Sequence, residues 1–240
     1  MLQINNLTVS VIGKKILNKI NFNFKLGKTY AVMGPNGSGK STLASVIMGN
    51  PIYSISAKSK IIFAGKNISK LSPDKRANLG LFTSFQQPLA FEGVTVFQLL
   101  KAVLQNKIKP DQLLLTINNY AKQLNLNPEL LTRSLNADFS GGERKKMEVL
   151  QAAVLNPKLI IYDEIDTGLD VDSLKIIANF INKNKHPNQT IILITHYTRI
   201  LKYIKPDEVI ILSEGKIVKK GNYKLAEEIE KKGYSKFELT

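Results

Sequence analysis

A glycine-rich stretch between an apolar segment and a helical one constrains the fold of this chain more than any other feature. Residues 34–42 read GPNGSGKST and match the pattern G-x-x-x-x-G-K-[S/T]; YAVM precedes them and LASVIMG follows. Glycines let the backbone wrap so that its N–H groups face phosphate oxygens, and the helix start adds partial positive charge. The stretch therefore predicts a strand–loop–helix unit that binds nucleotide phosphates, and this context disfavours a plain glycine turn.

The predicted phosphate loop supplies two side chains with distinct tasks. Lys40 is expected to reach the β and γ phosphates of ATP, and the Ser41 hydroxyl is expected to ligate Mg²⁺. The complete set of candidate ATP-binding residues here is Gly34, Pro35, Asn36, Gly37, Ser38, Gly39, Lys40, Ser41 and Thr42.

Predicted strands alternate with predicted helices along most of the chain. Several strands are continuous apolar runs, which are typical of a parallel sheet buried on both faces. The predicted strands are 2–11, 28–33, 60–65, 79–85, 158–164, 190–196 and 208–221. Between them, residues 97–105, 112–124 and 128–131 have helical spacing with no convincing strand. The pattern predicts an α/β core interrupted by a helical insertion.

The apolar run KLIIYDE ends in two adjacent carboxylates. Asp163 is a candidate for the Mg²⁺ shell, and Glu164 is a candidate general base or water-positioning residue. Paired acids after a strand are also common as a helix N-cap and a solvated neighbour. The phosphate loop upstream favours the functional interpretation. A further apolar run, IILIT, ends close to His196, which is placed to donate to a γ-phosphate. His186 lies in a loop without such a context.

A second glycine pair follows the helical insertion, in DFSGGERKKMEVLQ at residues 138–151. Ser140 and Glu143 have the spacing of a capping box that starts a helix. A capped helix N-terminus is also a site that binds anions, so the structural and functional interpretations are compatible.

Composition removes several classes of protein. The chain has no cysteine, which excludes disulfides and thiolate-held metal sites and permits a reducing compartment. Its longest apolar runs are far shorter than the roughly 20 residues of a membrane span, and residues 1–11 lack the pattern of a signal peptide. The net charge is +15, but only four of the 34 basic residues are Arg and the Lys residues are scattered. We therefore favour a solvated lysine-rich surface over a nucleic-acid partner.

The order of these motifs resembles that of the ABC-type ATPases over essentially the full chain. The resemblance implies an ABC-type nucleotide-binding domain: a RecA-like P-loop α/β core with an N-terminal antiparallel β region and an inserted helical subdomain. Residues 1–240 would form one domain, with the core at 1–87 and 157–240 and the helical subdomain, including the signature helix, at 88–156.

The ABC resemblance also implies roles for residues outside the phosphate loop. Gln86, in preference to Gln87, would contact Mg²⁺ and the attacking water and would couple the core to the helical subdomain. The signature residues Ser140, Gly141 and Gly142 would close on ATP held by the phosphate loop of a second subunit, in an ATP-dependent homodimer. Asp170 would lie in the loop that crosses this dimer. The aromatic residue that usually stacks on adenine is not evident; Val11 and its neighbours occupy that region.

Several stretches depart from the usual transporter pattern. Phe139 precedes the signature and Glu143 replaces its usual Gln, which puts a negative charge near an incoming triphosphate; Arg144, Lys145 and Lys146 are expected to offset it. Together, MGPNGSGKSTL, FSGGERKK, DEIDTGLDVDSLK and THYTRILKYIKPD resemble the SufC family, the ATPases of the Suf iron–sulfur cluster assembly system.

The SufC resemblance implies an ATPase that remodels SufB/SufD-like scaffold proteins in the cytoplasm, or in the plastid stroma if the chain is organelle-encoded, with no membrane insertion. With no thiols, the chain would leave iron and sulfur to these partners. The alternative is the ATP-binding subunit of an ABC transporter. A DNA-repair ABC ATPase is disfavoured because no long heptad segment interrupts the core.

Overall fold

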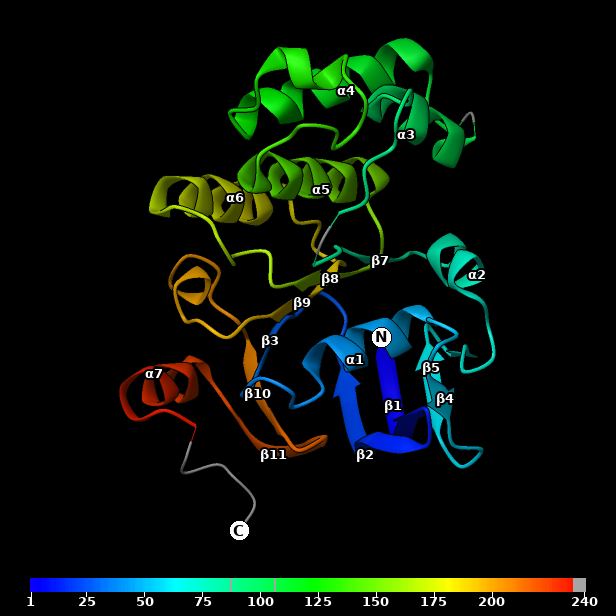
Figure 1. The fold of residues 1–240 in the computed structure, drawn as a ribbon, viewed down its shortest axis with the longest axis vertical. Helices are drawn as coiled ribbons and strands as arrows, with labels where there is room; N and C mark the ends of the chain where they lie inside the picture. The colour runs from blue at the N-terminus through cyan, green and yellow to red at the C-terminus, as the bar shows by residue number, and fades with distance from the viewer. Residues whose placement is uncertain (87, 106, 235–240) are drawn as a thin grey trace.

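The computed structural model describes residues 1–86, 88–105 and 107–234. Two sheets form its lower part, and helices α3, α4, α5 and α6 are stacked above the larger sheet (Figure 1). Gln87, the less favoured of the two glutamines, lies outside the described residues.

The larger sheet has the order β11-β10-β3-β9-β8-β7. Its strands are β11 (Lys216–Gly221), β10 (Glu208–Ser213), β3 (Thr29–Met33), β9 (Thr190–Ile194), β8 (Leu159–Asp163) and β7 (Leu81–Thr83). β10, β3, β9, β8 and β7 run parallel, and β11 pairs antiparallel with β10. β3, β8 and β9 are buried throughout, as expected for a parallel sheet covered on both faces. Their carboxyl ends share one edge, where the phosphate loop begins.

The smaller sheet has the order β2-β1-β5-β6, with β4 paired to β1, and every pairing is antiparallel. Its strands are β1 (Leu2–Val11), β2 (Lys14–Phe24), β4 (Ser54–Ile55), β5 (Lys60–Phe63) and β6 (Lys66–Asn67). The sequence analysis missed β2, although Ile20, Phe22 and Phe24 alternate with polar residues and are buried. Upstream of Ile20 the alternation fails, because the β1–β2 register shifts there and Lys19 adopts φ 52°.

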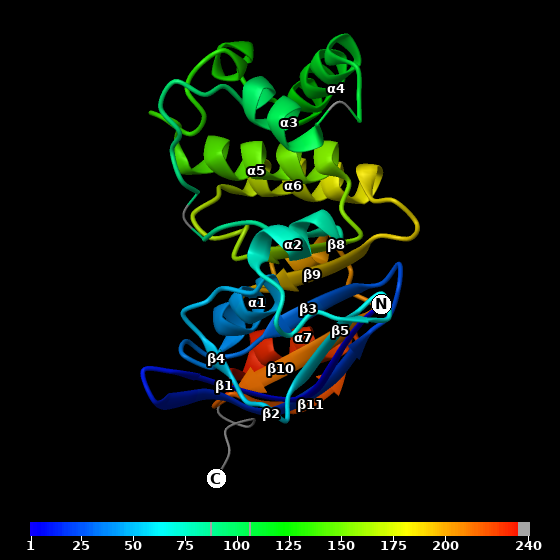
Figure 2. The same cartoon turned by 90° about the vertical axis from the view of Figure 1, so that its right-hand side faces the viewer.

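The helices occupy the connections between strands (Figure 2). α1 (Lys40–Met48) follows the phosphate loop, and α2 (Pro73–Asn78) precedes β7. Between β7 and β8 the chain forms α3 (Val96–Leu104), α4 (Pro110–Gln123), the 3-10 turn η1 (Pro128–Leu131) and α5 (Gly141–Leu155), as the helical spacing predicts. The remaining helical elements are α6 (Val171–Asn184), η2 (Ile200–Lys202) and α7 (Tyr223–Lys232). Within the described ranges, no helix combines the length and apolar character needed to cross a membrane.

Two hydrophobic cores lie on opposite faces of the larger sheet. Ala31 and Met33 of β3 pack into the core shared with α3, α4, α5 and α6, whereas Tyr30 and Val32 face the smaller sheet and α1. This alternation follows from the two-residue period of a strand. β3 is therefore held from both faces just before the chain turns into the phosphate loop.

A buried arginine closes the far end of α1. The Arg76 guanidinium donates hydrogen bonds to the carbonyl oxygens of Val46 and Ile47, both at 2.8 Å, and of Leu71 at 2.9 Å. It is 1% exposed, and burial lowers its pKa to about 10. The last carbonyls of a helix lack an intrahelical donor. Arg76 therefore supplies a donor to Ile47 and a further one to Val46, whose oxygen also accepts from the Gly49 N–H. This residue anchors the helix that starts at Lys40.

Candidate nucleotide-binding site

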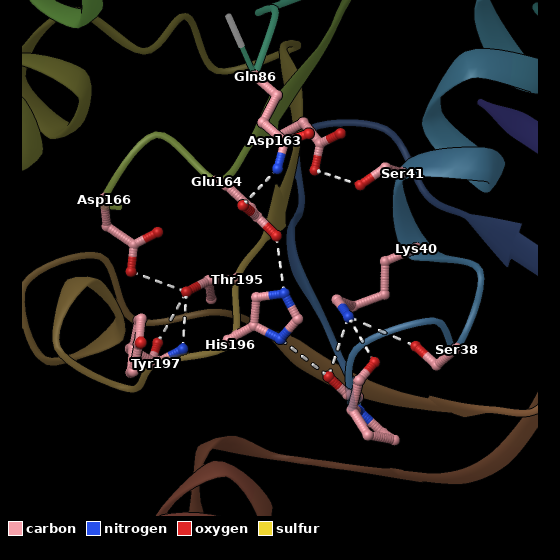
Figure 3. Close-up of polar contacts among 12 residues, drawn as sticks. Ser38, Lys40, Ser41, Gln86, Asp163, Glu164, Asp166, Thr195, His196 and Tyr197 are labelled. Atoms are coloured by element: carbon pink, nitrogen blue, oxygen red, sulfur yellow. Dashed lines mark hydrogen bonds and ion pairs between the residues drawn. The ribbon is translucent and has the colours of Figure 1, made fainter. Parts of the chain in front are cut away.

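The phosphate loop connects β3 to α1 and wraps around its own lysine. The Lys40 ammonium donates to the carbonyl oxygens of Gly34 at 3.0 Å and Pro35 at 2.9 Å, and it lies 3.4 Å from Ser38 Oγ (Figure 3). A Cβ at Gly34 would collide with the Leu212 carbonyl oxygen, so this close approach requires glycine. Burial lowers the pKa of Lys40 to about 8, although the Glu164 and Asp163 carboxylates oppose that shift. The loop therefore concentrates a cation and backbone N–H groups where phosphate oxygens would lie.

Asp163 ends β8 beside the start of α1. Its Oδ1 accepts a hydrogen bond of 3.3 Å from Ser41 Oγ, and its backbone N–H donates to Ser84 Oγ at 3.0 Å. Burial raises the pKa of Asp163 to about 6. The Ser41 hydroxyl and the Asp163 carboxylate are hard oxygen donors of the kind that Mg²⁺ prefers. This donor set fits a magnesium ion bound together with nucleotide phosphates.

Glu164 joins two of the residues predicted to act on the attacking water. Its Oε1 lies 2.7 Å from His196 Nε2, and its Oε2 accepts from Gln86 Nε2 at 2.9 Å. The other ring nitrogen of His196, Nδ1, lies 3.2 Å from the Gly34 carbonyl oxygen. Both ring nitrogens of His196 thus lie within hydrogen-bond distance of an oxygen atom. Glu164 has φ 53°, a left-handed backbone that disfavours non-glycine residues.

The chain thus brings four separate predicted segments to one cleft: the phosphate loop, Gln86, Glu164 and His196. The cleft has a volume of about 1030 Å³. Its lining includes Pro35, Asn36, Gly37, Gly39, Lys40, Ser41, Thr42, Gln86, Glu164 and His196, all predicted from the sequence, and also Lys14, Ile16, Thr167, Tyr197 and Tyr234, which were not. Val11 is not among them; Lys14 and Ile16 represent that region in the cleft. Lys14 and Ile16 belong to β2, the strand that the sequence analysis missed.

The signature residues form the expected helix start but do not line this cleft in the described part of the chain. Ser140 is the N-cap of α5: its hydroxyl accepts from the Glu143 N–H at 3.3 Å, and Glu143 Oε2 accepts from the Ser140 N–H at 2.8 Å. The predicted capping box is confirmed. Hydrogen bonds to Ser140 hold the pKa of Glu143 below its ordinary value. Gly141 and Gly142 form the first turn of the helix.

Asp170 is likewise a helix N-cap. Its Oδ1 accepts from the Ser173 N–H at 2.7 Å and its Oδ2 accepts from the Ser173 hydroxyl at 2.9 Å, which starts α6. Its predicted role across a dimer stays a prediction, as do the roles assigned to Ser140, Gly141 and Gly142.

Lys145 of the signature helix contacts the loop that carries Glu164. Its ammonium donates to the carbonyl oxygen of Glu164 at 2.7 Å and to that of Thr167. Burial lowers the pKa of Lys145. From the sequence, Lys145 was expected to offset charge near a triphosphate. In the structure it bonds to the backbone after β8, a long-range contact that no local pattern indicates.

Comparison with known proteins decides the family. The family model described as ABC transporter matches residues 17–167, which is more than half of the chain. The chain belongs to the ABC transporter ATPase family. Relatives of this ABC ATPase include the probable ATP-dependent transporter slr0075 of Synechocystis sp., 45% identical over 98% of this chain and 94% of the relative. The probable ATP-dependent transporter ycf16 of Cyanophora paradoxa is 41% identical over 98% of this chain and 93% of the relative.

Solved structures agree with this ABC ATPase fold. A nucleotide-free ATP-binding cassette from an ABC transporter is 25% identical, with a TM-score of 0.76, and the match covers 98% of this chain and 95% of the other. A dimeric ATP-binding cassette, MJ0796, described in a post-hydrolysis state with ADP and Pi, has a TM-score of 0.80 at 20% identity, covering 93% of this chain and 99% of the other. The predicted ABC nucleotide-binding fold is confirmed, and the protein is an ATPase that binds ATP.

Proposed function

We propose that this ABC ATPase is a SufC-type enzyme, which hydrolyses Mg·ATP to drive conformational change in SufB/SufD-like scaffold proteins during iron–sulfur cluster assembly. In this proposal Glu164 acts as the general base or water-positioning residue, while His196 and Gln86 contact the γ-phosphate and the attacking water. Ser41, Asp163 and Gln86 hold Mg²⁺, which would neutralise developing phosphate charge. Two chains close on two nucleotides, each signature facing the phosphate loop of the other chain.

One observation carries the proposal that hydrolysis is coupled to a partner. Gln86 bonds to Glu164, yet the side chains that flank it face solvent: Phe85 is 58% exposed, Leu89 64% and Phe91 43%. Three large apolar side chains exposed within seven residues of sequence favour an interaction surface. A partner that covers these side chains would contact the segment that positions Gln86, and could therefore change the rate of hydrolysis.

The scaffold role is supported by residues that depart from the usual transporter pattern. Glu143 is engaged in the capping box with Ser140, and Phe139 is buried before the signature. The chain has no cysteine, so thiolate-bound iron and sulfur belong on a partner.

The second candidate function is the ATP-binding subunit of an ABC transporter, which the names of the relatives favour. The two proposals share the site and differ in the partner.

Co-purification from native lysate separates them. Tagged Glu164→Gln with Mg·ATP provides a bait that holds nucleotide, and Lys40→Ala provides a matched bait that does not. Recovery of SufB/SufD-like proteins without detergent supports the scaffold role; recovery of a permease from the detergent-solubilised membrane supports the transporter. The double variant Phe85→Ser, Leu89→Ser should lose either partner while retaining ATP binding.

A further inference from the structure

One buried carboxylate has no part in the site described so far. Glu148 lies on α5, two turns beyond the signature, and is 5% exposed. Its Oε1 accepts a 2.7 Å hydrogen bond from the backbone N–H of Phe85. Its Oε2 is buried and has no hydrogen-bond partner among the described residues. A buried carboxylate that is only half satisfied is costly, so its single contact has an energetic weight that a surface contact lacks.

The contact with Phe85 completes a sequence of three successive anchors. The Ser84 hydroxyl accepts from the Asp163 N–H at the end of β8. The Phe85 N–H donates to Glu148 on α5. The Gln86 side chain donates to Glu164 at 2.9 Å. Ser84 is thus fixed to the sheet, Phe85 to the signature helix and Gln86 to the proposed general base.

The anchor at Phe85 is made by its backbone N–H, and the residue itself is 58% exposed. A backbone anchor sets the position of the following residue directly. Glu148 and the N-cap Ser140 lie eight positions apart on a continuous helix, which at 1.5 Å per residue is about 12 Å. A helix is rigid over this length, so the contact with Phe85 and the signature belong to one rigid element.

We infer that Glu148 is a positioning residue: its carboxylate ties the backbone before Gln86 to the signature helix, so that the placement of that helix sets the geometry of Gln86 and Glu164. The inference depends on the proposed role of Gln86. Glu148 itself touches neither nucleotide phosphates nor the attacking water.

The charges around Glu148 are consistent with this function. Burial raises its pKa to about 7, while the Phe85 N–H and the Lys145 ammonium favour the ionised form. Lys145 also bonds to the Glu164 carbonyl oxygen at 2.7 Å. Glu148 therefore holds the segment that carries Gln86, and Lys145 holds the segment that carries Glu164. The side chains of Gln86 and Glu164 bond to each other.

The test is a double-mutant cycle between Glu148 and Gln86, read as single-turnover ATP hydrolysis and ATP affinity. Glu148→Ala should lower the hydrolysis rate about tenfold or more, since small misplacement of a reacting group is costly, with the ATP Kd unchanged. Glu148→Gln retains an oxygen acceptor for the Phe85 N–H and should stay within about twofold of the native rate. Gln151→Ala is the matched control on α5, because among the described residues the Gln151 side chain bonds only to the Met147 carbonyl oxygen of its own helix.

The Gln86→Ala background distinguishes the possible failures. If Glu148 acts through Gln86, Glu148→Ala should cause no further loss in that background. A full additional loss there overturns the inference but leaves the role of Gln86 intact. If Gln86→Ala alone leaves hydrolysis unchanged, both the role of Gln86 and the inference are overturned. Where Glu148→Ala fails to fold, Glu148→Asp replaces it: the shorter side chain retains the charge and withdraws from Phe85, and a native rate would contradict the inference.

Discussion

Glu164 and His196 lie 2.7 Å apart, Oε1 to Nε2, and the second imidazole nitrogen of His196 lies 3.2 Å from the first carbonyl oxygen of the phosphate loop. His196 therefore links Glu164, which follows β8, to Gly34, which follows β3. The proposed base is thereby oriented against the loop that binds the reacting phosphate. Since Glu164 adopts a left-handed backbone at φ 53°, its position depends on such contacts.

Replacing the proposed base should separate binding from hydrolysis. Glu164→Gln retains the shape of the side chain and leaves Lys40, Ser41 and Asp163 in place, so Mg·ATP should still bind. Hydrolysis should fall by about 10²- to 10⁴-fold, the usual cost of losing general-base catalysis. The measurements are single-turnover hydrolysis and nucleotide titration, with Glu227→Gln, at an exposed position of α7, as a carboxylate control outside the cleft. Hydrolysis at the native rate would remove Glu164 from the proposed role.

The proposed action in trans can be tested by crosslinking. If two chains close on ATP, the signature of one faces the phosphate loop of the other. Ser140→Cys and Asn36→Cys should then crosslink between chains in an ATP-dependent way, and the absence of native cysteines keeps the background low. Asn36 is preferable to Gly37, since Gly37 adopts φ 76°, where a side chain is strained. An ATP-independent yield, or no product between chains, would contradict the trans arrangement.

Activity complementation provides independent evidence for the same arrangement. Lys40→Ala and Ser140→Arg should each be inactive as homodimers. In a mixed dimer both lesions fall in one composite site and the other site is whole, so turnover above the sum of the separate preparations supports action in trans.

Removing the buried arginine should destabilise the protein without altering the chemistry of the site. Arg76→Ala removes the guanidinium donor from the carbonyl oxygens of Val46, Ile47 and Leu71, and we expect a loss of about 3 kcal/mol in the free energy of unfolding. Denaturant titration measures this loss. Lys75→Ala on the same helix, at an exposed position, is the control and should change stability by less than about 0.5 kcal/mol.

Glu148 should also affect how the free energy of unfolding depends on pH. Its pKa rises from an ordinary value of 4.5 to about 7 on folding. Between these values the folded protein binds more protons than the unfolded chain, so this group makes stability fall as pH rises from 4.5 to about 7. The slope from one group reaches at most about 1.4 kcal/mol per pH unit. Glu148→Gln should flatten the curve in this window, as measured by denaturant unfolding across pH; an unchanged curve would show that the folded pKa is not raised.

The sequence predicted the site better than it predicted what supports the site. The phosphate loop, Asp163, Glu164 and His196 follow strands whose apolar character is local and clear, so their convergence at one sheet edge could be foreseen. Arg76, Lys145 and Glu148 could not be foreseen. Each is a charged residue on a helix, and its side chain bonds to a backbone group of another element. The spacing of apolar residues in the sequence does not predict such a contact.

The strand β2 was not predicted, for a different reason. Its last residues carry a clean alternation, but the irregular register near Lys19 interrupts it. The omission removed Lys14 and Ile16 from the expected cleft. Tyr234 was missed because it lies beyond the last predicted strand, far in sequence from every motif.

The contacts of Lys40 determine how ATP enters its loop. The ammonium group already donates to the carbonyl oxygens of Gly34 and Pro35, and the Gly34 oxygen also receives His196. When a phosphate binds, Lys40 therefore exchanges these carbonyl oxygens for phosphate oxygens as acceptors. The affinity for ATP reflects the difference in free energy between the two sets of hydrogen bonds. If Lys40 exchanges the Gly34 oxygen for a phosphate oxygen, the Gly34 oxygen keeps its contact with His196.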